Sequence, residues 1–230
     1  MPNWVYNGLT IEGNPDSVNK LVIQLNEPFK MVHDSWNMET HQQEKKLTLY
    51  ANPVFAFWNI IKPTDIEAYQ KQPEYKPNAS IADMMSHEGN DWYTWNNRNW
   101  GVKWDVAVSN DNEYTDTSME GPVQNGENLV VHYNFNTAWG IPHSALTNLS
   151  SQYPDLLFTL SYEEENGWGG EMEILRSEII SDNQYETKCN ECDTTDCMEY
   201  CEDCENNVCS FCGYGTSEEG CVEHKVEANA

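Results

Sequence analysis

Cysteine pairs with the spacing of metal ligands fill the C-terminal part of the chain. All eight cysteines lie between residues 189 and 221, and a histidine follows them. They form four C-x2-C or C-x2-H steps, which are Cys189/Cys192, Cys201/Cys204, Cys209/Cys212 and Cys221/His224. Each step holds two donors on one side of a metal, and eight donors complete two tetrahedral Zn²⁺ sites. We therefore expect two structural zinc ions, because no coordination position stays open for water or substrate.

The sharing of these steps between the two zinc ions stays open. Eight, four and eight residues separate successive steps. A sequential ribbon joins the first step with the second and the third with the fourth, whereas a cross-brace joins the first with the third and the second with the fourth. The tandem spacing favours the ribbon, and Cys197 is left as a spare thiol or an alternative ligand.

Other chemistries of clustered cysteines fit this tail less well. Disulfides require an oxidising compartment. A redox-active C-x2-C step requires a strand-to-helix context, which this acidic segment with short loops lacks. An iron–sulfur cluster needs fewer donors and no histidine. Zinc is therefore the predicted cofactor.

The chain is strongly acidic, with 12 Lys and Arg against 38 Asp and Glu and a formal net charge of −26. So few cations disfavour direct binding of nucleic acid and of anionic lipid. The excess acid either keeps the protein soluble or imitates a polyanion in the basic groove of another protein. From Glu186 onward, 12 acidic residues stand against two lysines, so a protein partner is expected for the tail as well.

The composition indicates a folded protein that does not cross a membrane. Hydrophobic residues make up 39% of the chain and aromatic residues 12%, which is enough for a packed core. No apolar run approaches the roughly 20 residues that a membrane span needs. The first residues have neither the basic region nor the apolar region of a signal peptide, so we expect a cytoplasmic location.

The abrupt appearance of cysteine divides the chain into a domain over residues 1–182 and a zinc-ribbon-like module over residues 183–230. Apolar residues alternate along 5–11, 102–108, 129–135 and 156–162, which predicts four strands. Helices are predicted over 14–25 and 142–153, and residues 70–90 read as a loop insertion. This order favours an α+β fold, a ferredoxin-like antiparallel sheet with helices on one face.

Four blocks of the first domain carry a family resemblance. They are residues 1–13 (MPNWVYNGLTIEG), 91–105 (DWYTW and NWGVKWD), 135–142 (FNTAW and a proline) and 162–170 (YEEE and GWGG). In these blocks the chain resembles the YubB-type or Api-like ferredoxin-like proteins of bacteriophages and conjugative plasmids. The resemblance implies a ferredoxin-like fold and a mobile-element origin. It supplies no catalytic residues, and the first 188 residues contain no cysteine for an iron–sulfur cluster.

Tryptophans and acidic residues are the remaining candidates for a binding site. The clustered Trp92, Trp95, Trp100 and Trp104 fit a core with a lid over the sheet, or an aromatic binding surface. Trp139 and Trp168 stand beside glycine-containing turns and are expected at such a surface. Glu163, Glu164 and Glu165 form either a solvated strand end or a set of carboxylates for acid–base chemistry. The candidate binding residues are Trp100, Trp104, Trp139, Glu163, Glu164 and Trp168.

These features favour an accessory protein that acts by binding another protein. The first hypothesis is a host-takeover or anti-defence factor with a contiguous acidic face. A virion or assembly protein is the alternative, and an enzyme that uses Glu163 to Glu165 is less favoured. The sequence contains no nucleophile elbow, P-loop or dinucleotide fingerprint, so no enzyme class is indicated.

Overall fold

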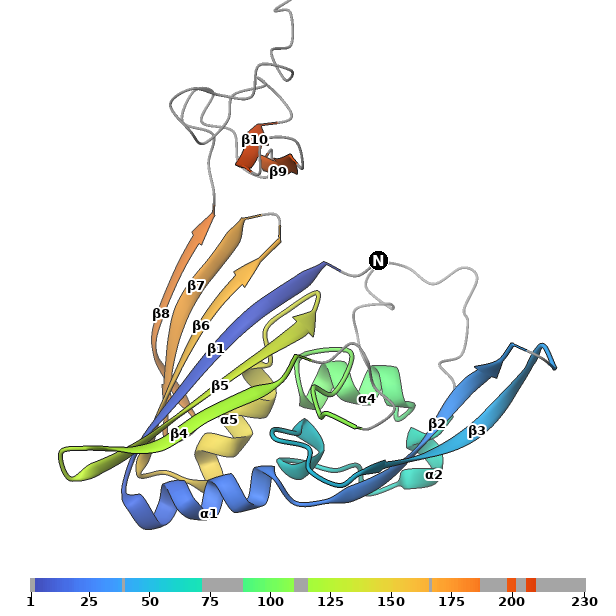
Figure 1. Cartoon of the computed structure of the whole chain (residues 1–230), viewed down its shortest axis with the longest axis horizontal. Coiled ribbons are helices and arrows are strands. Elements are labelled where there is room, and N and C mark those ends of the chain that lie inside the picture. Colours follow the sequence, from blue (N-terminus) through green and yellow to red (C-terminus); the bar gives the residue numbers. More distant parts are fainter. Residues whose placement is uncertain are drawn as a thin grey trace, which may run out of the picture.

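A six-stranded antiparallel sheet with helices on one face forms the body of the protein (Figure 1). The computed structural model describes residues 3–38, 40–71, 89–109, 116–165, 167–186, 198–201 and 206–209. The helices are α1 (Pro15–Leu25), the 3-10 helix η1 (Phe57–Asn59), α2 (Ile66–Tyr69), α4 (Trp92–Asn99) and α5 (His143–Gln152). The strands are β1 (Trp4–Gly13), β2 (Phe29–Asn37), β3 (Gln42–Tyr50), β4 (Ser118–Asn125), β5 (Asn128–Ala138), β6 (Leu156–Glu164), β7 (Trp168–Leu175), β8 (Glu178–Glu186), β9 (Met198–Cys201) and β10 (Asn206–Cys209).

The topology is that of a ferredoxin-like split βαβ arrangement. The sheet order is β4-β5-β1-β6-β7-β8, and β1 pairs with both β5 and β6 in antiparallel register. The chain therefore runs β1-α1-β4-β5-α5-β6, as the ferredoxin-like order requires. The hairpin of β7 and β8 then extends the sheet. The predicted α+β class, with an antiparallel sheet and helices on one face, is confirmed.

Local sequence explains the first βα unit. Asn14 caps α1, because its side chain accepts hydrogen bonds from the N–H groups of Asp16 at 2.9 Å and Ser17 at 3.4 Å. Pro15 occupies the first helical position, where no N–H is needed. The apolar face of the helix, with Leu21 and Leu25 fully buried, packs against β1 and β5. The helix predicted over residues 14–25 is confirmed.

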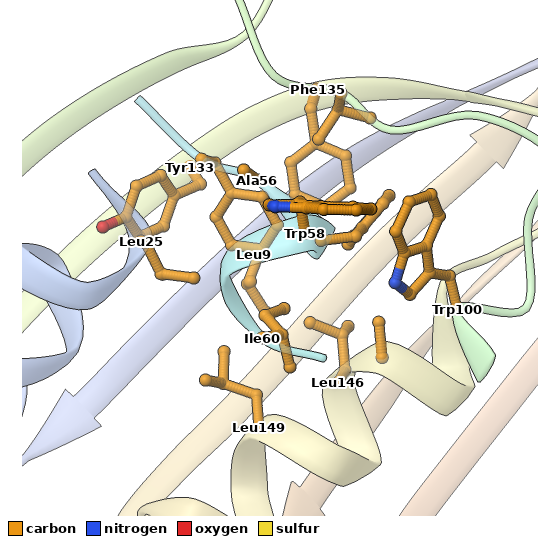
Figure 2. Close-up of a cluster of buried hydrophobic side chains, with 14 of the residues drawn as sticks. Leu9, Leu25, Ala56, Trp58, Ile60, Trp100, Tyr133, Phe135, Leu146 and Leu149 are labelled. Carbon is orange, nitrogen blue, oxygen red and sulfur yellow. The ribbon is translucent and has the colours of Figure 1, made fainter. Parts of the chain in front are cut away.

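The core lies between the sheet and its helices (Figure 2). Leu9 from β1 and Tyr133 and Phe135 from β5 point away from solvent on the covered face. Trp100 and Leu146 meet them from the opposite side in Figure 2. Aromatic rings contact one another here, and the indole of Trp100 lies 5.5 Å from that of Trp95 in a T-shaped pair. The predicted core role of these two tryptophans is confirmed.

Tandem glycines let β7 pair closely between two tyrosines. A side chain at Gly169 would meet the hydroxyl of Tyr185 at 2.6 Å, and one at Gly170 would meet the hydroxyl of Tyr162 at 2.6 Å. Because neighbouring strand residues point to opposite faces, one tyrosine covers the open face and the other the helix side. The GWGG block of the sequence is thus a consequence of packing.

A large connection separates α1 from β4. It contains the two-stranded hairpin of β2 and β3, then η1, α2 and α4. None of these elements was predicted from the sequence. The predicted loop over residues 70–90 falls largely on residues 72–88, which lie outside the described residues. No helix in the described part of the chain has the length and apolar character of a membrane span.

The predicted strand over residues 102–108 is wrong. Val102 and Val106 are buried, as the alternation required, but the segment has no strand partner and Trp104 is exposed. Gly101 begins the segment with φ +87, a conformation that breaks an extended strand. The alternation reflected burial of an irregular segment against the core.

The last strand of the sheet extends to Glu186, beyond residue 182, where the first domain was expected to end. Two cysteines of the tail, Cys201 and Cys209, lie in the paired strands β9 and β10. The register places Cys201 opposite Asn206, and Cys209 opposite Met198. The other predicted zinc ligands, Cys189, Cys192, Cys204, Cys212, Cys221 and His224, and the spare Cys197, lie outside the described residues.

Candidate functional site

One face of the six-stranded sheet is not covered by helices (Figure 1). Alternation along β1 sends Val5, Leu9 and Ile11 to the core and Tyr6 and Thr10 to the other side. The six strands contain no lysine and no arginine. Register and alternation place Glu12, Glu120, Glu163, Glu171 and Glu173 on this open face. The open face is therefore acidic as well as accessible.

A groove of about 840 Å³ crosses the open face near the start of β1 and the end of β6. Small residues form its floor. A side chain at Gly8 would meet the hydroxyl oxygen of Ser161 at 2.8 Å, so glycine there leaves the space open. The groove is lined by residues from β1, β5, β6, β7 and β8, including Tyr6, Asn134, Asn136, Ser161, Glu163, Glu171, Asn183 and Tyr185, with Asp116 beside them.

The groove offers amide, hydroxyl and carboxylate groups to a ligand. Glu163 and Glu171 stand on neighbouring strands, and both side chains are exposed. Tyr185 lies close to Glu163. Burial of the tyrosine, and to a smaller extent the negative charge of Glu163, raises the pKa of the tyrosine hydroxyl. Carboxylates attract cationic groups and accept hydrogen bonds from them. The arrangement is suited to binding positively charged or hydrogen-bond-donating groups.

Strand geometry separates the three consecutive glutamates. Glu163 points to the open face, Glu164 is buried on the helix side with 3% of its surface exposed, and Glu165 lies in the turn after β6. Residues at i and i+1 of a strand cannot share a face. Glu163 therefore lines the groove, Glu164 does not, and the three carboxylates do not form one catalytic cluster.

The candidate tryptophans fall into two groups. Trp100 is fully buried and belongs to the core, so it cannot contact a partner directly. Trp168 is half-buried, and its ring packs 6.0 Å from that of Tyr162. Trp104 and Trp139 are exposed over 39% and 52% of their surfaces. Only the last two present large aromatic surfaces to solvent.

These exposed indoles contact each other beside the start of β1 and the end of β5. Their ring centroids are 6.1 Å apart, and the ring of Trp4 lies 6.2 Å from that of Trp104. Trp4 precedes Tyr6 on the open face of β1, so the aromatic patch adjoins the groove. Here the patch means Trp4, Trp104 and Trp139.

A buried polar chain shapes the turn that carries Trp139. The amide of Asn7 donates to the hydroxyl of Thr137 at 2.9 Å, and this hydroxyl donates to the carbonyl of Gly140 at 2.6 Å. The N–H of Trp139 donates to the carbonyl of Asn3 at 2.9 Å. Trp139 has φ +64, which is uncommon for so bulky a residue. The fold holds this indole in a strained backbone position.

Asp105 fixes the segment that carries Trp104. One carboxylate oxygen accepts from the N–H groups of Phe57 and Val106, both at 2.8 Å, and from Ala107 at 3.2 Å. The other accepts from Trp58 at 2.9 Å. Burial raises the pKa of Asp105 to about 6 even though these hydrogen bonds favour the charged form. Sequence reasoning missed this residue, because an acidic residue between Trp104 and Val106 is typical of the exposed side of a strand.

Within the described residues, no three His, Cys, Asp or Glu side chains converge on a point that could hold a metal ion. Among the histidines, His132 lies on the open face, and its ring nitrogen Nδ1 is 2.9 Å from the hydroxyl of Thr10.

Comparison with known proteins gives one match to a family model. Residues 104–205 match the model of the ferredoxin-like domain in Api92-like proteins. This segment resembles an Api92-like protein. The match runs from Trp104 through β4 to β9 and covers less than half of the chain. It supports the family resemblance predicted from the sequence and the ferredoxin-like topology described above.

A solved structure and the curated proteins complete the comparison. The crystal structure of protein Api92 from Yersinia pseudotuberculosis is similar with a TM-score of 0.41 and 10% sequence identity. The alignment covers 82% of this chain and 100% of that one. No curated protein matches the chain.

Proposed function

We propose that this protein binds a positively charged segment of another protein on the open face of its sheet. The observation that carries the proposal is an acidic groove on six strands that contain neither lysine nor arginine. Such a face repels polyanions and attracts lysine- and arginine-rich segments. This is the behaviour expected of a mobile-element accessory protein that imitates a polyanion toward a host nucleic-acid-binding protein.

Charge reversal in the groove tests the proposal. We expect the double variant Glu163→Lys with Glu171→Lys to bind an octalysine peptide at least about tenfold more weakly than the unaltered protein does. Each substitution replaces an attraction by a repulsion in the lining of the groove. Isothermal titration calorimetry at two salt concentrations measures the change.

A matched variant separates the groove from the overall charge. Glu27→Lys with Glu67→Lys changes the net charge by the same amount at exposed positions outside the sheet. It should leave the affinity within about twofold of the original, because neither residue lines the groove and salt screens exposed charges outside it. If both double variants weaken binding equally, the peptide senses net charge only and the groove is not the site.

We also propose that the tail binds two zinc ions through its four ligand steps. The register of β9 and β10 supports a division between two metals. Cys209 of β10 pairs with Met198 of β9, and Cys201 lies three residues further along β9. The two cysteines are therefore about 10 Å apart along the strand direction. Ligands of one Zn²⁺ lie within about 2.3 Å of the same ion. The second and third steps should therefore serve different zinc ions, as they do in both the ribbon and the cross-brace.

Metal analysis of protein purified without added zinc tests the tail. We expect close to two zinc ions per chain, with thiols that become titratable only after chelation. Cys201→Ser should lose about one ion per chain, because three remaining ligands bind zinc much more weakly. Cys197→Ser, outside the four steps, should retain both ions. Protein that contains no metal and few free thiols would instead have a disulfide-bonded tail.

A further inference from the structure

The side-chain ammonium of Lys103 lies against the rings of the aromatic patch. The ammonium nitrogen of Lys103 lies 4.4 Å from the ring centroid of Trp104 and 4.6 Å from that of Trp139. The ring of Tyr93 is 5.8 Å away. The two indoles are tilted by 30° to each other, so they form a wedge around the ammonium. We call Tyr93, Trp104 and Trp139 the aromatic cage.

Three separate segments are brought together to build this cage. Tyr93 comes from α4, Trp104 from the irregular segment after it, and Trp139 from the turn after β5. Buried Asn96 positions the lysine backbone, because its amide donates to the carbonyl of Lys103 at 2.8 Å. A tight contact at Gly101 allows the segment to approach the turn, since a side chain there would meet the carbonyl of Ile141 at 3.0 Å.

The geometry of the cage is unfavourable for the stability of the fold. It leaves two large indoles about half in solvent, where they gain little from burial. It also holds Trp139 at φ +64, a backbone conformation that is strained for so bulky a side chain. Strain and exposed aromatic rings at the same place are typical of a ligand site.

The chemistry of the cage selects a weakly hydrated cation. Indole and phenol rings attract cations through their negative faces. The primary ammonium of Lys103 gives up hydration to enter the wedge, and this desolvation lowers the pKa of the lysine. A quaternary ammonium group carries the same charge, binds water far less strongly and fills more of the wedge. Replacement of the Lys103 ammonium by a quaternary ammonium group would keep the cation–π attraction and return the lysine to water.

We propose that the aromatic cage is a binding site for a quaternary ammonium group, as found in choline compounds and in trimethyllysine, and that Lys103 closes the site until the ligand displaces it. The flexible four-carbon stem of a lysine allows this movement without a change in the fold. The net charge of −26 favours the approach of a cationic ligand. This site is separate from the groove, so either can fail without the other.

Calorimetric titration with choline chloride tests the site, with ammonium chloride and sodium chloride at equal ionic strength as controls. We expect choline to bind and the two controls to show no binding. Lys103→Ala opens the cage and should tighten choline binding by about tenfold. Trp139→Ala removes one wall and should abolish it. Circular dichroism and thermal unfolding of both variants establish that they fold.

The lysine variant decides between a ligand site and a structural contact. If the folded Lys103→Ala protein binds choline no more tightly than the unaltered chain, or if folded Trp139→Ala still binds it, the proposal is wrong.

A peptide with one trimethyllysine identifies the source of the group. Tighter binding of the peptide than of choline supports a protein ligand, and the reverse order supports a small molecule or a lipid headgroup. Failure of both to bind overturns the site.

Discussion

Replacement of Asp105 by alanine is expected to destabilise the protein by about 3–5 kcal/mol, because four backbone N–H groups lose their acceptor. These groups belong to η1 and to the segment that carries Lys103 and Trp104. Alanine cannot accept a hydrogen bond, and the site lies against the core. Denaturant unfolding followed by circular dichroism measures the loss.

A second aspartate provides the matched control. Asp91 caps α4 by accepting from the N–H of Thr94 at 3.1 Å, a single backbone hydrogen bond at a helix end. Asp91→Ala should cost only about 1 kcal/mol. If the two alanine variants are equally stable, the carboxylate of Asp105 does not organise the segment as its contacts indicate.

The pH dependence of the same site has a definite sign. Burial raises the pKa of Asp105 from 3.8 to about 6 in the folded protein. The folded state therefore binds this proton more tightly than the unfolded chain does, so the contribution is fully present below pH 3.8 and is lost as the pH rises through 6. Asp105→Asn removes the titrating group. The stability of the unaltered protein relative to this variant should increase as the pH falls from 7 to 4, and a constant difference would contradict the raised pKa.

Replacement of Trp100 by alanine is expected to cost about 3–5 kcal/mol, because a completely buried indole is lost from the core. The indole N–H also donates to the carbonyl of Ile61 at 3.2 Å, so this carbonyl loses its partner. For a chain of this size the thermal midpoint should fall by roughly 10 °C. Differential scanning calorimetry measures the shift.

An exposed tryptophan supplies the comparison. Trp139 has half of its surface in solvent, so Trp139→Ala should change the stability by less than about 1 kcal/mol, and relief of its strained backbone offsets part of the loss. Equal destabilisation by the two variants would mean that the aromatic cage is a packing element of the core.

Regular elements with a clear period could be predicted from the sequence. The alternation along residues 129–135 and 156–162 became β5 and β6, and the helix predicted over residues 14–25 became α1. In each case one face is buried and the other is solvated, so apolar residues recur in the sequence with the period of the strand or helix. The helix predicted over 142–153 became α5 for the same reason.

Elements without such a period were missed. β4 is exposed along almost its whole length, so its side chains show no alternation. In β7, two consecutive glycines interrupt the pattern, and their role depends on tyrosines of the neighbouring strands. The hairpin of β2 and β3 lies in a long connection whose placement depends on contacts with the body. Local patterns carry no signal for contacts of this kind.

The sequence by itself determined the acidic character, the ligand spacing of the tail and the residue types available for binding. The tertiary structure decided which of them share a surface. Glu163 reached the groove while Glu164 was buried, because a strand turns successive residues to opposite faces. Lys103 met Trp139 only because an irregular segment and a distant turn pack together at one end of the sheet. Contacts between residues far apart in the chain depend on the packed fold, so a local pattern could not predict them.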